Sequence, residues 1–274
     1  MAQVSHVPRR FRSAARFILS ALFLVSGFWL LLYFDALHQR RKAESLFTDL
    51  KSFSFASADF GEVRDFALSH GGSGVQEFPP SLPTLGLPIQ NSQGQVQIPS
   101  VWSKPRCTSR DCVFEVWIRP SLQTVTLSYP SEIRLLFAMR YAGIRPWGVY
   151  ATFEIVDDKL KRSRTSVEGL KNGTSGGYEG TIPLEYEVIS DADPVYGDQS
   201  YSVGRPHVTG GPLEILQVKM AQMPNMPAAR GFDVNLRCLT AVSHGCSFSE
   251  LAPSAWSDYQ REVSHDGRQG KSGA

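Results

Sequence analysis

The longest apolar stretch of the chain lies near its N-terminus, where residues 17–34 read "FILSALFLVSGFWLLLYF" without a charged side chain. At about 1.5 Å per residue, a helix of this length spans about 27 Å, close to the thickness of a bilayer's hydrocarbon core. Trp29 and Tyr33 lie near its far end, where amphipathic rings favour the headgroup level. We therefore expect an uncleaved transmembrane signal anchor at residues 17–37. A buried core helix and a cleaved signal peptide are the alternatives.

Two helical patterns follow the anchor, so residues 38–72 are predicted to be a juxtamembrane helical segment. Leu46 and Leu50 continue a helical spacing, which extends the first helix to about residue 52. A second helix is expected over residues 57–70, with Ser57 as its cap and two glycines after its end. This helix is expected to pack against the domain that follows.

Strand patterns dominate the chain after a linker rich in Pro, Gly, Ser and Gln at residues 73–100. Apolar and polar side chains alternate in several short runs, which is typical of half-buried strands. The predicted strands are 112–118, 147–156, 159–167, 181–189, 212–220 and 232–240. The other expected elements are a short helix at 131–143, a surface loop at 172–180, a helix at 249–262 and a disordered tail at 263–274.

These elements predict an α+β fold in which one N-terminal transmembrane helix precedes a β-rich, largely antiparallel sheet domain with two or three short helices. The domain is assigned to residues 101–262, and residues 1–16 form a short basic tail. No internal repeat is present. About 160 residues are enough to bury a hydrophobic core without many covalent bridges.

The net charge of +2 is unevenly distributed along the chain. Four arginines at positions 9, 10, 12 and 16 are the only charged side chains before Asp35. Removing these 4 from the 28 basic residues leaves 24 against 26 acidic ones, so the remainder carries about −2. A nucleic-acid-binding protein is expected to have a strong basic excess, which argues against that class.

The four cysteines form two close pairs, Cys107 with Cys112 and Cys238 with Cys246. Two local disulfides are the simplest arrangement, although four cysteines allow three connectivities. A metal site that includes His244 and buried free thiols are the alternatives. An even number of paired cysteines behind a signal anchor indicates an oxidising compartment. The positive charges that flank the anchor are balanced, so the cysteines decide the expected orientation, with the N-terminus cytoplasmic and the domain outside.

No catalytic or cofactor-binding motif is present. The nucleophile elbow G-x-S-x-G, the S-x-x-K motif and the zinc motif H-E-x-x-H are all absent, and "GKS" at 270–272 lacks the first glycine of a phosphate-binding loop. We therefore expect no enzyme activity, no cofactor and no metal. Glu185 and Glu187 share one face of a predicted strand, and they are interpreted as solvent-exposed side chains rather than an acid–base pair.

Aromatic side chains on predicted strand faces are the remaining candidate for recognition. If Trp117 and Tyr150 lie on the solvent face of neighbouring strands, they form an exposed recognition surface. The alternative is that a second layer, such as the helix at 57–70, covers them.

The favoured function is binding or scaffolding in a cell envelope by a single-pass membrane protein, with a bacterial inner membrane as the expected location. Its expected partners are the lipid bilayer, through residues 17–34, and an unknown envelope protein or ligand. One alternative is an envelope enzyme whose site combines scattered residues such as His207, Glu185 and Asp198. Another is an accessory subunit of a membrane complex.

Overall fold

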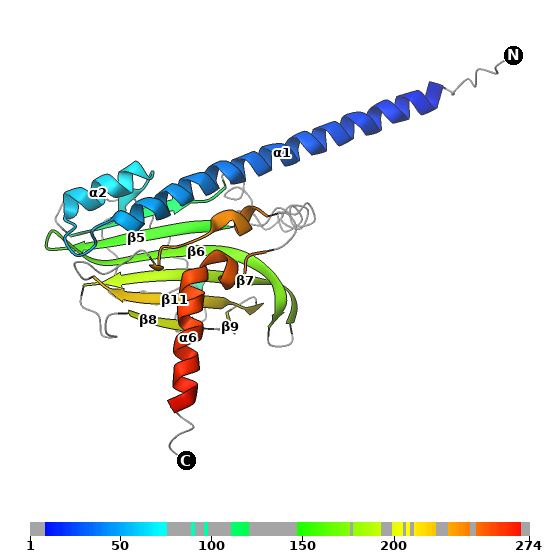
Figure 1. The fold of residues 1–274 in the computed structure, drawn as a ribbon. Coiled ribbons are helices and arrows are strands. Elements are labelled where there is room, and N and C mark those ends of the chain that lie inside the picture. Colours follow the sequence, from blue (N-terminus) through cyan, green and yellow to red (C-terminus); the bar gives the residue numbers. More distant parts are fainter. Residues whose placement is uncertain are drawn as a thin grey trace.

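The structure is a computed structural model of the 274-residue chain, shown in Figure 1. It describes residues 9–75, 89–90, 96–97, 111–120, 147–175, 178–192, 199–204, 207–208, 211–222, 230–241 and 245–269. Several expectations lie outside these residues, namely the helix at 131–143, most of the linker at 73–100, and the positions of Cys107, Asp198 and His244.

The N-terminal helix α1 (Arg9–Ser52) is a single continuous helix of 44 residues. Its first half projects away from the folded domain, and its second half lies across the sheet (Figure 1). Eleven large apolar side chains between Phe17 and Phe34 are exposed, and only 6% of the most apolar window is buried. A core helix would be largely buried. The helix is long and apolar enough to cross a membrane, and it ends at residue 52 as the periodicity predicted.

The second half of α1 belongs to the core of the domain. Ala43, Leu46 and Leu50 are fully buried, and the ring of Phe47 lies 6.4 Å from that of Phe232. These positions recur every three or four residues, so they form one helix face. The helical segment at 38–72 and the β-rich domain therefore both contribute to one hydrophobic core.

The second helix, α2 (Phe60–Ser69), begins later than predicted. Asp59, rather than Ser57, is the N-cap, and its carboxylate accepts a hydrogen bond from the Glu62 amide at 2.9 Å. At the other end Gly71 has a φ of +76°, and the Gly72 amide donates to the Ala67 carbonyl oxygen at 2.8 Å. This is the hydrogen-bond pattern of a glycine-terminated helix, which explains why the glycine pair ends α2.

The main sheet has seven strands in the order β1-β4-β5-β6-β7-β11-β8. The pair β7–β11 is parallel, and the other neighbouring strands are antiparallel, so the α+β prediction with a largely antiparallel sheet is confirmed. The strands are β1 (Ser73–Val75), β4 (Cys112–Ile118), β5 (Gly148–Val156), β6 (Lys159–Ser175), β7 (Tyr178–Asp191), β8 (Gln199–Gly204) and β11 (Glu214–Ala221). Two small sheets pair β2 (Ile89–Gln90) with β3 (Val96–Gln97) and β9 (His207–Val208) with β10 (Gly211–Pro212).

Two segments that were expected to be irregular are strands. The predicted loop at 172–180 is instead the end of the β6–β7 hairpin, whose pairing continues to Ser175 opposite Tyr178. Only two residues, both glycines, connect these strands, and short Gly-rich connections are typical of hairpins. The first residues of the predicted linker form β1, which pairs with β4 at the edge of the sheet.

The predicted strand at 232–240 is also wrong, because the segment is irregular and then forms the 3₁₀ helix η3 (Leu236–Thr240). The Asn235 side chain caps this helix by accepting from the Arg237 amide at 3.2 Å. Apolar residues at alternate positions fit a strand, yet an asparagine that bonds a backbone amide two residues ahead favours a turn.

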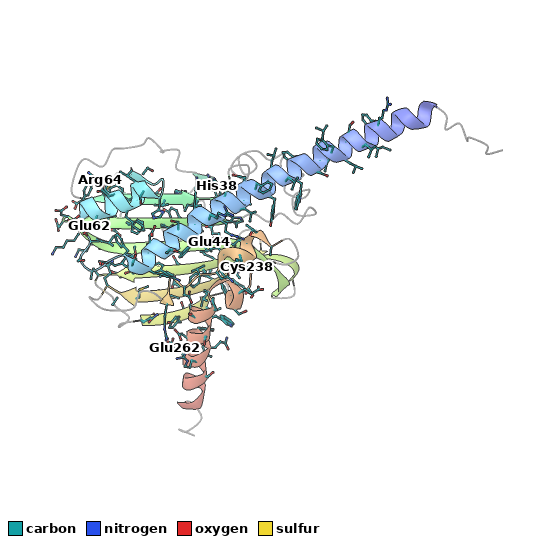
Figure 2. The ribbon with its side chains drawn as sticks, turned by 45° about the horizontal axis from the view of Figure 1, so that its top comes forward. His38, Glu44, Glu62, Arg64, Cys238 and Glu262 are labelled. Carbon is teal, nitrogen blue, oxygen red and sulfur yellow. A yellow bond between two sulfur atoms is a disulfide. The ribbon has the colours of Figure 1, made fainter. Side chains whose placement is uncertain are left out.

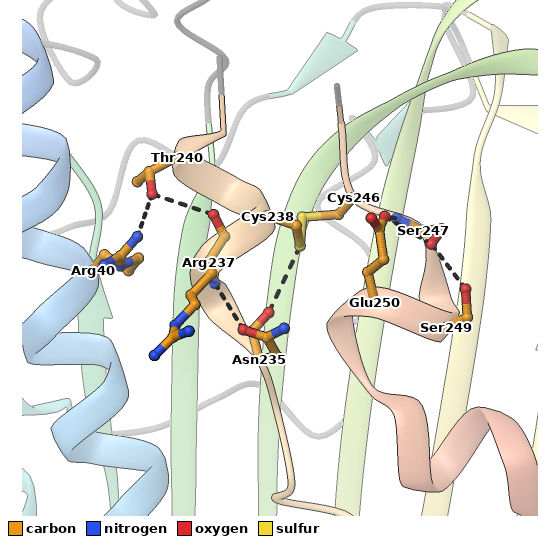
Figure 3. The surroundings of a disulfide bond; sticks show 9 residues. All are labelled: Arg40, Asn235, Arg237, Cys238, Thr240, Cys246, Ser247, Ser249 and Glu250. Atoms are coloured by element: carbon orange, nitrogen blue, oxygen red, sulfur yellow. Dashed lines mark hydrogen bonds between the residues drawn. A yellow bond between two sulfur atoms is a disulfide. The ribbon is translucent and has the colours of Figure 1, made fainter. Parts of the chain in front are cut away.

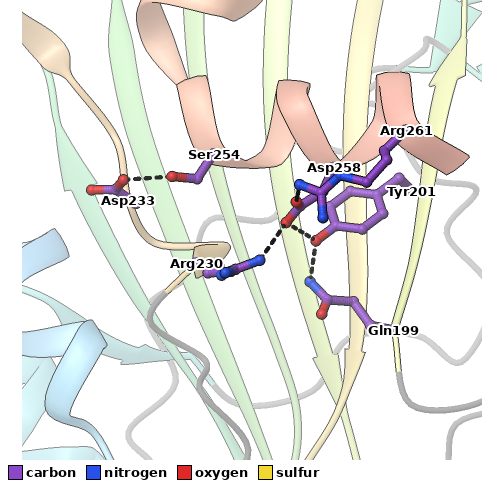
Figure 4. Close-up of polar contacts among 7 residues, drawn as sticks. All are labelled: Gln199, Tyr201, Arg230, Asp233, Ser254, Asp258 and Arg261. Carbon is purple, nitrogen blue, oxygen red and sulfur yellow. Dashed lines mark hydrogen bonds and ion pairs between the residues drawn. The ribbon is translucent and has the colours of Figure 1, made fainter.

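The C-terminal helices are α5 (Phe248–Leu251) and α6 (Pro253–Gln269). α6 includes residues 263–269, which were predicted to be disordered. Its first turns are fastened to the sheet by Asp258, whose carboxylate accepts from Tyr201 at 3.0 Å and pairs with Arg230 and Arg261 (Figure 4). The Ser254 hydroxyl also donates to Asp233 at 2.8 Å. From residue 260 to residue 264 every side chain is exposed, because this part of α6 extends beyond the sheet (Figure 1).

All the described helices lie on one face of the sheet (Figure 1). Aromatic rings fill the space beneath them: Phe66 lies 5.5 Å from Phe153, and Phe60 lies 5.5 Å from Phe114. The buried Tyr186 hydroxyl donates to the Gly231 carbonyl oxygen at 2.5 Å, so the main polar atom of that large side chain is satisfied. We call this side of the sheet the helix face, and the other side the polar face.

Candidate functional site

The polar face is built by alternate residues of neighbouring strands, because successive strand side chains point to opposite sides of a sheet. The pairing places Trp117 beside Tyr150, Tyr150 beside Ser166, and Ser166 beside Glu187. Among the described strand side chains of this face, six are acidic and four are basic. They are Glu115, Glu154, Glu168, Glu185, Glu187 and Asp191 against Lys159, Arg162, Arg164 and Lys219.

Two aromatic residues and a carboxylate form one end of this face. The ring centroids of Trp117 and Tyr150 are 4.1 Å apart. The Tyr150 hydroxyl donates to Glu115 at 3.1 Å, and the Trp117 indole N–H donates to the same carboxylate at 3.3 Å. Glu115 is only 5% exposed, whereas Trp117 is 52% exposed. Burial, followed by the Glu115 charge and its hydrogen bond, raises the pKa of Tyr150 above its usual range, so Tyr150 stays a hydrogen-bond donor.

An arginine connects two further carboxylates at the centre of the face. The Arg164 guanidinium pairs with Glu187 and lies 3.7 Å from a carboxylate oxygen of Glu185. The Gln217 amide on β11 also donates to Glu187. Glu185 is 6% exposed and Glu187 is 2% exposed, so both are buried. One guanidinium therefore partly compensates two carboxylates that have been removed from water.

The interpretation of Glu185 and Glu187 as solvent-exposed strand residues is therefore wrong. Burial, together with the neighbouring Glu187 charge, raises the pKa of Glu185 to about 7, although Arg164 acts in the opposite direction. A carboxyl group with this pKa changes its charge near neutral pH. Sequence periodicity placed the two residues correctly on one strand face, but it could not reveal their burial.

The two aromatic residues proposed for recognition lie where the alternation placed them, side by side on one face. The helix suggested as their cover, α2, lies on the opposite face, where Phe60 contacts Phe114. Arg119, just beyond the end of β4, places its guanidinium carbon 5.8 Å from the centre of the Trp117 ring. Outside α1, Leu68, Trp117 and Val263 are the exposed large hydrophobic residues of the described chain, so Trp117 is the one on the polar face.

The scattered residues considered for an enzyme are not brought together in the described part of the chain. His207 belongs to the small β9–β10 sheet, whereas Glu185 lies in β7 of the main sheet, and Asp198 lies outside the described residues. Within the described ranges, no group of three or more His, Cys, Asp or Glu side chains has an arrangement that could hold a metal ion.

Of the two predicted disulfides, the structure shows the bond between Cys238 and Cys246. Cys238 at the centre of η3 is bonded to Cys246, which precedes α5 (Figure 3). Cys112 is also disulfide-bonded, and no described cysteine is a free thiol. The Cys238–Cys246 bond fixes η3 beside α5, and on its other side η3 contacts α1 through a hydrogen bond from Arg40 to Thr240 of 2.6 Å.

No protein-family model matches the sequence, and comparisons with curated proteins and with solved structures give no significant match.

Proposed function

We propose that this protein is a single-pass membrane protein whose folded domain lies outside the cytoplasm and binds a partner through the polar face of its sheet. The long exposed apolar half of α1 supports the membrane anchor. The paired cysteines support an oxidising compartment for the domain. The short basic segment at residues 1–16, which includes the first turns of α1, is consistent with a bacterial inner membrane and with a cytoplasmic N-terminus.

The observation that carries the binding proposal is the exposure of Trp117. A half-exposed tryptophan is costly to leave in water, and such residues are enriched where proteins recognise partners. Trp117 packs against the tilted ring of Tyr150 and shares a carboxylate with it, so its position is fixed before a partner arrives. Preorganised aromatic residues lose little conformational entropy on binding.

The charge of the polar face favours a positively charged partner segment. Carboxylates outnumber basic groups six to four among the described strand side chains of this face. A lysine or arginine of the partner would gain from the net negative field and from contact with the exposed aromatic ring.

A photo-reactive amino acid placed at position 117 tests the proposal in intact cells, with the same replacement at Leu68 as the control. Leu68 is 54% exposed, but it belongs to α2 on the helix face. We expect a specific cross-linked partner from position 117 and none from position 68, and that partner should no longer co-purify with the Trp117→Ala variant. Identical cross-linking from both positions, or none from position 117, contradicts the proposal.

Orientation is tested separately by thiol labelling of intact cells with and without reductant. We expect the cysteines to be labelled from outside only after reduction. Labelling of all four cysteines from the cytoplasmic side without reductant would place the domain in the cytoplasm.

A further inference from the structure

The connection between the apolar half of α1 and the folded domain is short and rigid. The last exposed large apolar residue of the anchor is Phe34, and Arg40, six residues later, already donates to Thr240 of the domain at 2.6 Å. Six helical residues correspond to about 9 Å along the axis. Because α1 is one continuous helix, no flexible stalk separates the anchor from the domain.

This spacing places the η3 end of the domain at the membrane surface. The headgroup layer on each side of a bilayer is about 5–8 Å thick, so a point about 9 Å beyond the hydrocarbon lies at its outer edge. The Cys238–Cys246 disulfide fixes η3 to α5 on the side away from α1 (Figure 3). The domain therefore approaches the bilayer as a rigid body with η3 at the near end.

Three consecutive basic residues of α1, Arg40, Arg41 and Lys42, lie where the helix leaves the expected membrane. Their side chains have two different environments. Arg40 faces the domain, where it pairs with Glu44 at 3.2 Å and holds Thr240. Arg41 and Lys42 are exposed on the outer side of the helix. Helical side chains lean toward the N-terminus, so these two cations extend back toward the membrane, and long basic side chains reach headgroups in this way.

We propose that Arg41 and Lys42 bind the phosphates of anionic lipid headgroups and so hold the domain against the membrane surface. This inference rests on the proposed membrane anchor, but not on the proposed partner of the polar face. Juxtamembrane basic residues are attracted to anionic lipids, and each one has an appreciable effect near the surface. A phosphate contact at this point fixes the tilt of the domain, because Arg40 and η3 couple that point of α1 to the sheet.

Arginine footprinting of the full-length protein in nanodiscs tests the proposal with an internal control. Phenylglyoxal modification of Arg41 is compared with that of Arg64, which lies on α2 at the far end of the domain from the projecting half of α1 (Figure 2). One set of nanodiscs contains phosphatidylcholine alone, and the other also contains phosphatidylglycerol. We expect Arg41 to be modified about fivefold more slowly in the anionic nanodiscs, with Arg64 unchanged.

A second measurement uses variants to follow the lipid itself. Protein purified from the mixed bilayer should retain less phosphatidylglycerol in the double variant Arg41→Gln/Lys42→Gln, and the same amount as wild type in Arg64→Gln. Equal Arg41 reactivity in the two nanodiscs, or unchanged lipid retention in the double variant, overturns the proposal. Failure of the full-length protein to enter nanodiscs would instead contradict the anchor, so the two failures are distinguishable.

Discussion

The two faces of the sheet are formed by the same strands, but they differ in burial and in charge. On β5, Phe153 is fully buried against Phe66 and Phe53, whereas its neighbour Thr152 is only partly buried on the other side. The helix face is covered by helices from both ends of the chain, because α1 and α2 come before the sheet and α6 follows it. The polar face carries the partly compensated charges and the exposed tryptophan. The helix face therefore stabilises the domain, whereas the buried charges of the polar face destabilise it.

The cost on the polar face has an identifiable origin. A buried carboxylate is stable only when opposite charge and hydrogen bonds replace its lost hydration. Arg164 serves both Glu185 and Glu187, so the compensation is shared. Buried groups of this kind are common where a protein binds or transforms a ligand, which is why the contrast between the faces is worth testing by mutation.

The largest expected effect comes from removing a ring on the helix face. Phe153→Ala should destabilise the domain by about 3–5 kcal/mol, because it leaves a cavity among packed aromatic rings. Thr152→Ala, one residue away on the polar face, should cost less than about 1 kcal/mol, since it removes one long hydrogen bond. Thermal unfolding of the full-length protein in mild detergent measures both. Similar losses for the two variants would contradict the division between faces.

The next effect depends on pH and concerns Glu185. Its folded pKa of about 7 lies above the ordinary value of 4.5, so the folded state binds the proton more tightly than the unfolded state does. The resulting destabilisation is absent below about pH 4.5, grows as the pH rises, and reaches about 3 kcal/mol above pH 7. Glu185→Gln removes this penalty. The variant should gain stability over wild type at about pH 8 and lose most of that gain at about pH 5.

The control for this experiment is Glu154→Gln, because Glu154 is an exposed glutamate on the same face. Its stability difference from wild type should change little between the two pH values. If Glu185→Gln showed the same flat response, Glu185 would be an ordinary surface carboxylate and the polar face would carry no buried charge there.

A smaller effect is expected where α2 meets the edge of the sheet. A Cβ added at Gly72 would lie 2.6 Å from the Glu115 carbonyl oxygen and 2.7 Å from that of Ala67, both of them backbone atoms. Gly72→Ala should therefore cost about 1–3 kcal/mol. Gly148→Ala is the matched control, because nothing lies within 4 Å of its added Cβ, and its effect should stay below about 0.5 kcal/mol. Equal melting temperatures for the two variants would contradict the close packing at Gly72.

The smallest expected change in stability belongs to the residue with the largest expected change in binding. Trp117→Ala should alter the free energy of unfolding by less than about 1 kcal/mol, because the side chain is 52% exposed. It should nevertheless abolish co-purification of the partner identified by cross-linking. A large loss of stability in Trp117→Ala would assign this tryptophan to the core and weaken its role in recognition.

Local patterns in the sequence predicted much of the fold correctly. The continuous α1 to residue 52 and the buried positions of β4 and β5 follow from periodicity. Errors occurred where two local signals conflicted. The alternating residues of 232–240 resemble a strand, but the cap at Asn235 favoured η3, and the glycines near residue 176 concealed a hairpin.

The candidate site could be located in part. Alternation along β4 and β5 placed Trp117 and Tyr150 on one face, and strand pairing then made them neighbours. The role of Arg164 could not be found in this way, because the carboxylates that it contacts lie on β7, more than twenty residues later in the sequence. Gln217 on β11, which donates to Glu187, lies later still.

The sequence by itself determined which segments are apolar, which cysteines lie close together and which side chains share a strand face, because these properties depend on near neighbours in the chain. Only the tertiary structure decided that α1 and the sheet share one core, that the helices leave the polar face to the strands, and that Glu185 and Glu187 are buried. The physical reason is that burial and charge compensation depend on segments brought together from distant parts of the chain. A local sequence pattern does not show which side chains those segments remove from water.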